Sequence, residues 1–365
     1  MNFSLESHPE AFSVESLQVS TLALPGMIFS KIFSNPSAMT FEITALEKRE
    51  RTGRTMKVTI LGAGAMGCLY ASYLAKNRAV DLMLLDHNPE KVEKINRDGL
   101  VMRENSGREI QIPVHAALSG VESVGQTDVL MVFVKAHQTY EAMKKNSFLI
   151  GPDTTVLSLQ NGMGNYLEIG KFLPLDRIVI GTSNHNSTTL GYGNFLHAAD
   201  GKTIIGSFTK DSSRVELVKS LFAGTGLDIS SSPDVRRLIW RKLLVNMCIN
   251  PLTMLMEVRN GFLQADRPSW NCVESVVSEG LAVAAADGVE FDREEILELI
   301  RKICLVTRSG CSSMYQDRTH KRSTEIDFIN GMVVKLARKY RIPVPCNTFL
   351  VQLVRGVENS YVPPN

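Results

Sequence analysis

The sequence predicts an α/β fold with a mostly parallel sheet in its first part and an all-α fold in its second part. Two observations carry this prediction. Strand-like apolar runs alternate with helical patterns between residues 56 and 233, and every periodic segment after residue 234 has helical spacing. Alternating strands and helices build a doubly wound sheet of the Rossmann type. We therefore expect a Rossmann domain over 56–233 and an all-helical domain over 234–365.

The first elements of the predicted sheet have the order strand, glycine turn, helix. Residues 57–61 have the pattern of a buried strand, G-x-G-x-x-G follows, and 68–76 has the pattern of a helix. The first glycine permits a tight turn, the second lets the backbone approach a pyrophosphate, and the third lets helix and strand pack closely. A second strand, 81–86, ends in an acid at the spacing typical of a ribose-binding residue. The predicted dinucleotide-binding residues are Gly62, Ala63, Gly64, Ala65, Met66, Gly67 and Asp86.

Two later strands deliver polar side chains at their carboxyl ends. Residues 128–134 lead to Lys135 and His137, and residues 155–159 lead to Asn161. Ligands of open α/β sheets bind at those ends, so Lys135 and Asn161 are candidate site residues. A histidine just past a buried strand is more often a packing or loop residue, and His137 is not included.

The remaining elements follow from caps and periodicity. Asn88 and Pro89 predict the start of a helix that runs to Arg97. Short strand-like pieces, 178–183 and 202–207, are expected as outer strands of the sheet. Helices are predicted over 234–249, 269–287, 292–307, 324–340 and 348–359. The substrate is expected between the two domains.

The helix pattern over 234–249 places unusual polar groups in one column. Lys242, Asn246 and Asn250 are spaced i, i+4 and i+8, so they share a face among apolar neighbours. An ammonium and two carboxamides provide a proton donor and neutral hydrogen-bonding groups for a small polar molecule. A surface stripe on an amphipathic helix is the plainer interpretation of such a column taken alone.

Composition bounds the class of protein. The 40 Lys and Arg nearly balance the 38 Asp and Glu, and the net charge of +2 gives no footprint for nucleic acid. The six cysteines form no C-x-x-C pair and several fall in apolar helical patterns, which fits a reducing compartment. No run of eighteen apolar residues and no secretory signal is present. We expect a cytoplasmic protein that binds no membrane.

Residues 1–55 show no clear periodicity. They contain Pro9, Pro25 and Pro36 and end just before a core strand. Two interpretations remain open: a genuine, poorly ordered extension, or a natural start at Met56 with an upstream segment that is not native. The second is favoured.

These ordered motifs resemble the 2-dehydropantoate 2-reductase (ketopantoate reductase) family. The resemblance covers essentially Met56 to the C-terminus. It rests on the glycine turn, Val134-Lys135-Ala136-His137-Gln138, Gln160-Asn161-Gly162-Met163-Gly164, Trp240-Arg241-Lys242 through Asn246 to Asn250-Pro251-Leu252-Thr253, Asn260-Gly261, and Ser312-Ser313-Met314-Tyr315-Gln316-Asp317 leading to Thr324-Glu325-Ile326-Asp327. So many ordered motifs are far more specific than a glycine turn alone.

The resemblance implies reduction of 2-dehydropantoate to (R)-pantoate by hydride from a nicotinamide, a step toward pantothenate and coenzyme A. Lys242 matches the catalytic lysine and Glu325 the active-site glutamate, which pairs with Lys242 or holds the cofactor ribose. Glu325 also fits the first turn of a helix capped by Thr324. No metal is expected.

The resemblance also implies a substrate-binding set and further cofactor contacts. Asn246, Asn250 and Asn260 match residues that bind the substrate's oxygens, and Ser313 matches one near its carboxylate. Asn250 precedes a proline and Asn260 a glycine, so each also fits a helix stop or turn. Lys135, Asn161 and Glu325 match family positions that contact the cofactor. The position of Asn161 also contacts the substrate.

Asp86 departs from the family pattern, which commonly has an arginine there to bind the 2′-phosphate of NADPH. A carboxylate accepts hydrogen bonds from ribose hydroxyls and repels a phosphate, which favours NADH. His87, Lys91 or Lys94 still offer positive charge, so the family's NADPH stays open.

Two rival functions and one association remain open. The rivals are a reductase of another 2-keto or β-hydroxy acid and a non-catalytic dinucleotide-sensing module. A homodimer is expected from apolar positions beyond one obvious helix face: Leu281, Val283, Val333, Val334, Leu336, Leu350 and Leu353.

Overall fold

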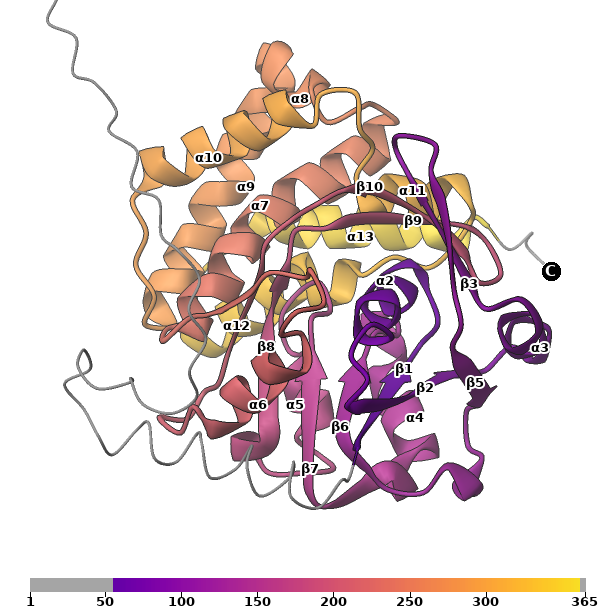
Figure 1. The fold of residues 1–365 in the computed structure, drawn as a ribbon. Helices are drawn as coiled ribbons and strands as arrows, with labels where there is room; N and C mark the ends of the chain where they lie inside the picture. The colour runs from indigo at the N-terminus through magenta and orange to yellow at the C-terminus, as the bar shows by residue number, and fades with distance from the viewer. Residues whose placement is uncertain (1–54, 362–365) are drawn as a thin grey trace, which may run out of the picture. The chain divides into compact units, whose positions relative to one another are not determined.

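The computed structural model describes residues 55–361, which belong to one compact unit of the chain. The two interpretations of residues 1–55 therefore lie outside the described residues, except for Thr55. Figure 1 shows the sheet strands in indigo and magenta and the later helices in orange and yellow, gathered beyond one end of the main sheet.

The main sheet confirms the predicted α/β fold. Its strand order is β12-β11-β8-β7-β6-β1-β2-β5, and every neighbouring pair is parallel except β11 with β8. The central strands are buried on both faces by helices, which explains their unbroken apolar runs. The strands are β1 (Met56–Leu61), β2 (Val80–Asp86), β5 (His115–Leu118), β6 (Thr127–Val132), β7 (Ile150–Ser158), β8 (Ile178–Ser183), β11 (Thr203–Gly206) and β12 (Ile229–Ser231).

A second sheet was not predicted. It has four strands in the order β4 (Glu109–Ile112), β3 (Leu100–Glu104), β10 (Asn194–Ala199) and β9 (Asn186–Gly191). The segment 177–208 therefore divides: β8 and β11 join the main sheet on one side of β7, although β12 and not β11 is the edge strand there, whereas β9 and β10 leave the main sheet. The polar, half-exposed strand β9 gives no apolar alternation from which to assign a sheet.

The helices between the strands pack on the main sheet. They are α2 (Ala65–Leu74), α3 (Pro89–Asp98), α4 (Thr139–Lys145), α5 (Asn165–Ile169) and α6 (Ser213–Leu221). The predicted cap of α3 is confirmed, because the Asn88 side chain accepts a hydrogen bond from the Lys91 amide at 3.1 Å.

The chain after Asp234 is helical, as predicted. The helices are α7 (Val235–Met256), α8 (Phe262–Ala265), α9 (Arg267–Ala286), α10 (Arg293–Val306), α11 (Ser313–Thr319), α12 (Asn330–Tyr340) and α13 (Pro345–Asn359). The predicted end of the first at residue 249 is wrong, since α7 continues through Pro251. Proline removes the amide that would bond the Met247 carbonyl, and the buried Asn330 side chain donates to that carbonyl instead, at 2.7 Å.

The predicted helix start at Thr324 is also wrong. A short 3-10 turn covers Ile326–Phe328, and α12 begins only at Asn330. The segment before α12 is held by the turn that follows β7, because the Phe328 carbonyl accepts a hydrogen bond from the Met163 amide at 2.7 Å. Long-range contacts therefore replace a helical first turn.

One apolar core joins the sheet to the helices. It includes Leu61 and Leu130 of the sheet together with Leu243 and Met247 of α7. The division between domains at residues 233 and 234 stays a prediction. No helix in the described part of the chain has the length and apolar character needed to cross a membrane. All six cysteines are free, and Cys68, Cys248 and Cys304 are buried.

The apolar residues behind the dimer expectation are largely used within the chain. Val283, Val333, Val334 and Leu350 are buried in the core, and Leu281 and Leu336 pack against it. Leu353 is exposed. The homodimer stays an expectation. Most of the apolar residues that suggested it are used inside the chain.

Candidate active site

The Lys242 ammonium lies where α7 meets the end of β8. Its Nζ donates a hydrogen bond to the main-chain carbonyl of Ser183 at 2.8 Å. The neighbouring Trp240 is fully buried and fixes this turn of α7, with its Nε1 donating to the Asp287 carboxylate at 2.9 Å. Burial lowers the pKa of Lys242 to about 8, although the negative charge of Glu325 acts in the opposite direction. The ammonium can therefore exchange a proton near neutral pH.

Asn246 and Asn250 follow Lys242 on α7 at one-turn intervals. Asn250 is buried and Asn246 is half-buried. Within residues 55–361 neither carboxamide forms a hydrogen bond, so both are available to a ligand. Since α7 continues to Met256, Asn250 is not a helix stop.

Asn260 carries an unsatisfied buried oxygen. Its Nδ2 donates to the Thr307 hydroxyl at 3.0 Å, whereas its buried Oδ1 has no partner among the described residues. A buried acceptor without a donor is costly, and the described residues supply no donor for this oxygen.

Ser313 is the first residue of α11. The cap of this helix is Ser312, whose hydroxyl accepts hydrogen bonds from the Tyr315 amide at 3.1 Å and from the Thr253 hydroxyl at 2.8 Å. The second bond ties α11 to α7, one turn beyond Asn250. The Ser313 side chain is thus not needed as a cap.

Glu325 reaches back to the carboxyl ends of two strands. Its buried carboxylate accepts hydrogen bonds from the Ala136 amide at 3.2 Å and from Asn161 Nδ2 at 3.3 Å. The alternative role in the first turn of a helix does not fit, because α12 starts five residues later. Within residues 55–361, Glu325 forms no direct ion pair with Lys242. The Glu325 carboxylate acts on the Lys242 ammonium only through its charge, at longer range.

Lys135 and Asp317 form an ion pair between the sheet and α11. Lys135 Nζ lies 2.8 Å from the Asp317 carboxylate, and Asp317 is buried. Burial raises the pKa of Asp317, and Lys135 opposes that shift. No role for Asp317 follows from the sequence, because an acid on a helix has the same pattern whether it is buried or exposed. The Ser183 carbonyl could not be predicted either, since a main-chain group has no side-chain signal. His137 is exposed and outside this group.

The glycine loop has the form expected for an anion site. Gly62 has a φ of +106°, and a Cβ on Gly67 would lie 2.0 Å from the Gly62 carbonyl oxygen. A Cβ on Gly64 would meet nothing within 4 Å, which leaves room for a ligand beside the backbone. The first turn of α2, which contains Ala65 and Met66, has no acidic residue. The residues present fit a pyrophosphate on the α2 N-terminus.

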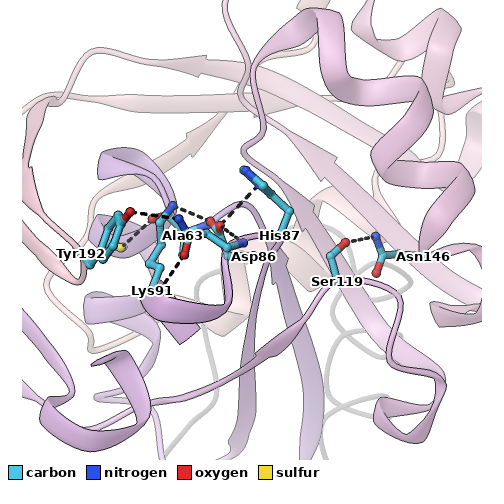
Figure 2. Close-up of polar contacts among 9 residues, drawn as sticks. Ala63, Asp86, His87, Lys91, Ser119, Asn146 and Tyr192 are labelled. Carbon is cyan, nitrogen blue, oxygen red and sulfur yellow. Dashed lines mark hydrogen bonds and ion pairs between the residues drawn. The ribbon is translucent and has the colours of Figure 1, made fainter. Parts of the chain in front are cut away.

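Asp86 lies at the end of β2, beside this loop (Figure 2). Its buried carboxylate accepts hydrogen bonds from the Ala63 amide at 3.0 Å and the Asn88 amide at 3.1 Å. Lys91 Nζ is 2.8 Å away, so this lysine neutralises Asp86. Lys94 is paired with Asp98 at 2.8 Å. The exposed His87 also lies near this carboxylate, with its Nδ1 3.5 Å from Asp86 Oδ1.

The chain matches two family models over most of its length. The model described as "Ketopantoate reductase PanE/ApbA" matches residues 58–210, and "Ketopantoate reductase PanE/ApbA C terminal" matches residues 234–358. The 2-dehydropantoate 2-reductase of Halobacterium salinarum is 33% identical over 305 residues, covering 82% of this chain and 98% of that protein. The enzyme of the same name from Pyrococcus abyssi is 31% identical, covering 83% and 98%.

Solved structures of similar fold include enzymes with different names. D-mandelate dehydrogenase with NADH and anilino(oxo)acetate has a TM-score of 0.79 at 30% identity, covering 84% of this chain and 99% of that one. The PanE/ApbA family ketopantoate reductase from Ralstonia eutropha has a TM-score of 0.77 at 29% identity, with the same coverage.

Proposed function

This chain belongs to the ketopantoate reductase family of oxidoreductases, and we propose that it reduces 2-dehydropantoate to (R)-pantoate. The product would serve pantothenate and coenzyme A synthesis. The observation that carries the proposal is the Lys242 ammonium, held by the Ser183 carbonyl at 2.8 Å with its pKa lowered to about 8.

Lys242 is the proposed proton donor. A nicotinamide, when bound, supplies the hydride to the keto carbon. Negative charge then develops on the keto oxygen, and a neighbouring ammonium both stabilises that charge and delivers a proton. The pKa of about 8 suits the donor, since it is protonated at neutral pH yet gives up its proton more readily than an exposed lysine.

The proposed substrate-binding set combines three asparagine carboxamides with Ser313. Asn246, Asn250 and Asn260 would bind the hydroxyl and carbonyl oxygens, and Ser313 the carboxylate. The unpartnered Asn260 Oδ1 would accept from a substrate hydroxyl, which supports a hydroxyl-bearing keto acid over an unsubstituted one.

Glu325, Asn161 and Lys135 are proposed to orient the two ligands against each other. The Glu325 carboxylate is fixed by Ala136 and Asn161, so it can accept a cofactor ribose hydroxyl without turning. Its charge also favours the protonated form of Lys242. Lys135 would exchange part of its contact with Asp317 for an anionic group of a ligand.

NADH is the proposed cofactor, with the pyrophosphate on the glycine loop. The pairing of Lys91 with Asp86 and of Lys94 with Asp98 leaves little positive charge for a 2′-phosphate. The similar D-mandelate dehydrogenase contains NADH. NADPH remains the alternative that the family resemblance suggests.

A second candidate is the reduction of another 2-keto acid with NADH. Two observations favour it. Asp86 favours NADH, and the structure is similar to that of D-mandelate dehydrogenase, with a TM-score of 0.79. An aromatic keto acid would leave the Asn260 oxygen without a donor, which is why 2-dehydropantoate is preferred.

The test is an assay of the purified full-length chain that follows the absorbance of the reduced nicotinamide. 2-Dehydropantoate and 2-oxo-2-phenylacetate would each be supplied with NADH or with NADPH. The proposal expects the highest kcat/KM with 2-dehydropantoate and NADH. A higher kcat/KM with the aromatic acid would replace it by the second candidate, and no oxidation in any combination would reject both in favour of a non-catalytic module.

A further inference from the structure

The half-buried His185 in the turn after β8 contacts the buried His197 of β10, and the proposed reaction uses neither histidine. We propose that His185 is a positioning residue: hydrogen-bonded to Gly201 and His197, it fixes this turn so that the Ser183 carbonyl faces the Lys242 ammonium. The inference rests on the proposed role of Lys242 as proton donor.

The turn is clamped against the loop that leads into β11. The Asn184 amide donates to the Lys202 carbonyl at 3.0 Å, and the Gly201 amide donates to His185 Nδ1 at 3.2 Å. The His185 amide in turn approaches the Ser183 hydroxyl at 3.4 Å. A Cβ on Gly201 would lie 2.2 Å from the Asn184 carbonyl carbon, so the two backbones touch. His185 is the side chain that joins them.

The hydrogen bonds define how His185 is protonated. Because Nδ1 accepts from Gly201, the neutral ring carries its proton on Nε2, an assignment made from the network. His197 Nε2 lies 3.2 Å from the same Nδ1, whose single lone pair is shared between the two groups, and the buried His185 Nε2 has no partner within residues 55–361. Burial lowers the pKa of His185, and His197 adds to this effect while Asp200 opposes it. The ring therefore stays a neutral acceptor at neutral pH.

The surroundings of the ring are aromatic. Tyr70 and Tyr73 of α2 each place their ring centroid 6.4 Å from that of His185, and His197 comes from β10. The same segment touches the glycine loop, since the Ser187 hydroxyl donates to the Ala65 carbonyl at 3.2 Å. One short stretch thus connects the helix of the glycine loop to the acceptor of the Lys242 ammonium.

His185, His197 and Asp200 also form a set of potential metal ligands whose atoms lie within 4.8 Å of one another. The Nδ1 lone pair of His185 is already directed at the Gly201 amide, and the Asp200 side chain is 88% exposed. We therefore interpret the cluster as a hydrogen-bond network.

The position of the Ser183 carbonyl bears directly on Lys242. It is the hydrogen-bond acceptor for the ammonium within residues 55–361, and burial alone would favour the neutral amine. A hydrogen bond to the charged form counteracts that effect. If the turn shifts and the contact is lost, the pKa of Lys242 is expected to fall further below its usual value.

Three substitutions of His185 separate positioning from packing. Asn places an oxygen acceptor where Nδ1 lies, Gln places its polar group where Nε2 lies, and Leu has no acceptor. We expect His185→Asn to behave like the native chain. His185→Gln and His185→Leu are expected to lower kcat about fivefold at pH 8 and to leave it unchanged at pH 6, where Lys242 stays protonated. Gly201→Ala, which displaces the same turn from its other side, should give the same result.

The pKa of Lys242 can also be measured without turnover. The pH dependence of its labelling by a small amine-reactive reagent is followed by mass spectrometry. A lower pKa in the Gln, Leu and Gly201→Ala variants, with Asn near the native value, supports the proposal. Equal loss of kcat at both pH values, or an unchanged Lys242 pKa in folded Gln and Gly201→Ala variants, overturns it. If the native chain reduces no keto acid but the labelling shift is present, the positioning role stands and the proposed function fails.

Discussion

The glycine loop gathers its residues from six consecutive positions, Gly62 to Gly67, whereas the group around Lys242 draws on segments from Lys135 to Glu325. The loop is determined by local geometry: a positive φ at Gly62 and a close approach at Gly67. The Lys242 group depends on long-range contacts, such as Asn161 with Glu325 and Lys135 with Asp317. Substitutions should therefore act on folding and cofactor binding at the loop, and on catalysis at Lys242.

The largest effect is expected from Lys242→Ala. Removing a general acid lowers kcat by about 10²–10⁴-fold, because the charge on the keto oxygen loses both its stabilising cation and its proton. Steady-state kinetics with saturating substrate measures this loss. Arg241→Ala, on the neighbouring exposed position of α7, is the matched control and should retain activity. Equal activity of the two variants would contradict the assignment of Lys242.

The pH profile sharpens the same assignment. The pKa of about 8 lies below the usual value for lysine, so the acid form predominates at pH 7 and is lost as the pH rises through 8. We expect kcat to be level near pH 6–7 and to fall about tenfold per pH unit well above 8. Lys242→Arg should remove this limb, since a guanidinium does not titrate there. A rate that increases above pH 8 would indicate a base instead.

At the loop, Gly67→Ala and Gly64→Ala should separate folding from binding. The Gly67 Cβ meets the Gly62 carbonyl oxygen, so this variant is expected to lose about 1–3 kcal/mol of stability. The Gly64 Cβ meets nothing within 4 Å, so that variant should keep its thermal midpoint and bind the cofactor more weakly. Thermal unfolding and cofactor titration measure the two effects. A destabilised Gly64→Ala would contradict the contrast.

The smallest effect is expected at the end of β2. Asp86→Ser frees the Lys91 ammonium beside the ribose position and should raise the kcat/KM for NADPH relative to NADH about tenfold. Asp98→Ser, which frees Lys94 on the same helix, is the control and should leave the ratio unchanged. No change in the Asp86 variant would show that this carboxylate does not select the cofactor.

Sequence periodicity predicted the central parallel strands and most helices after Asp234, but not β5 and β12 at the two edges of the main sheet. The predicted elements have apolar residues that repeat with the spacing of the element that buries them. Periodicity did not predict the second sheet, since β9 is polar and half-exposed. It also ended α7 too early. A proline inside a helix normally stops it, but the buried Asn330, 83 residues after Met247, supplies the hydrogen bond that the Met247 carbonyl would otherwise lack.

Local sequence alone thus determined the glycine loop, the cap of α3 and the column of Lys242, Asn246 and Asn250, because turn chemistry and helical spacing are properties of neighbouring residues. Tertiary structure decided which groups face that column. The Ser183 carbonyl and the Glu325 carboxylate reach their places through contacts between residues far apart in the chain. Such contacts leave no periodic pattern in the sequence, and burial, which sets the pKa of Lys242, exists only once the chain has folded.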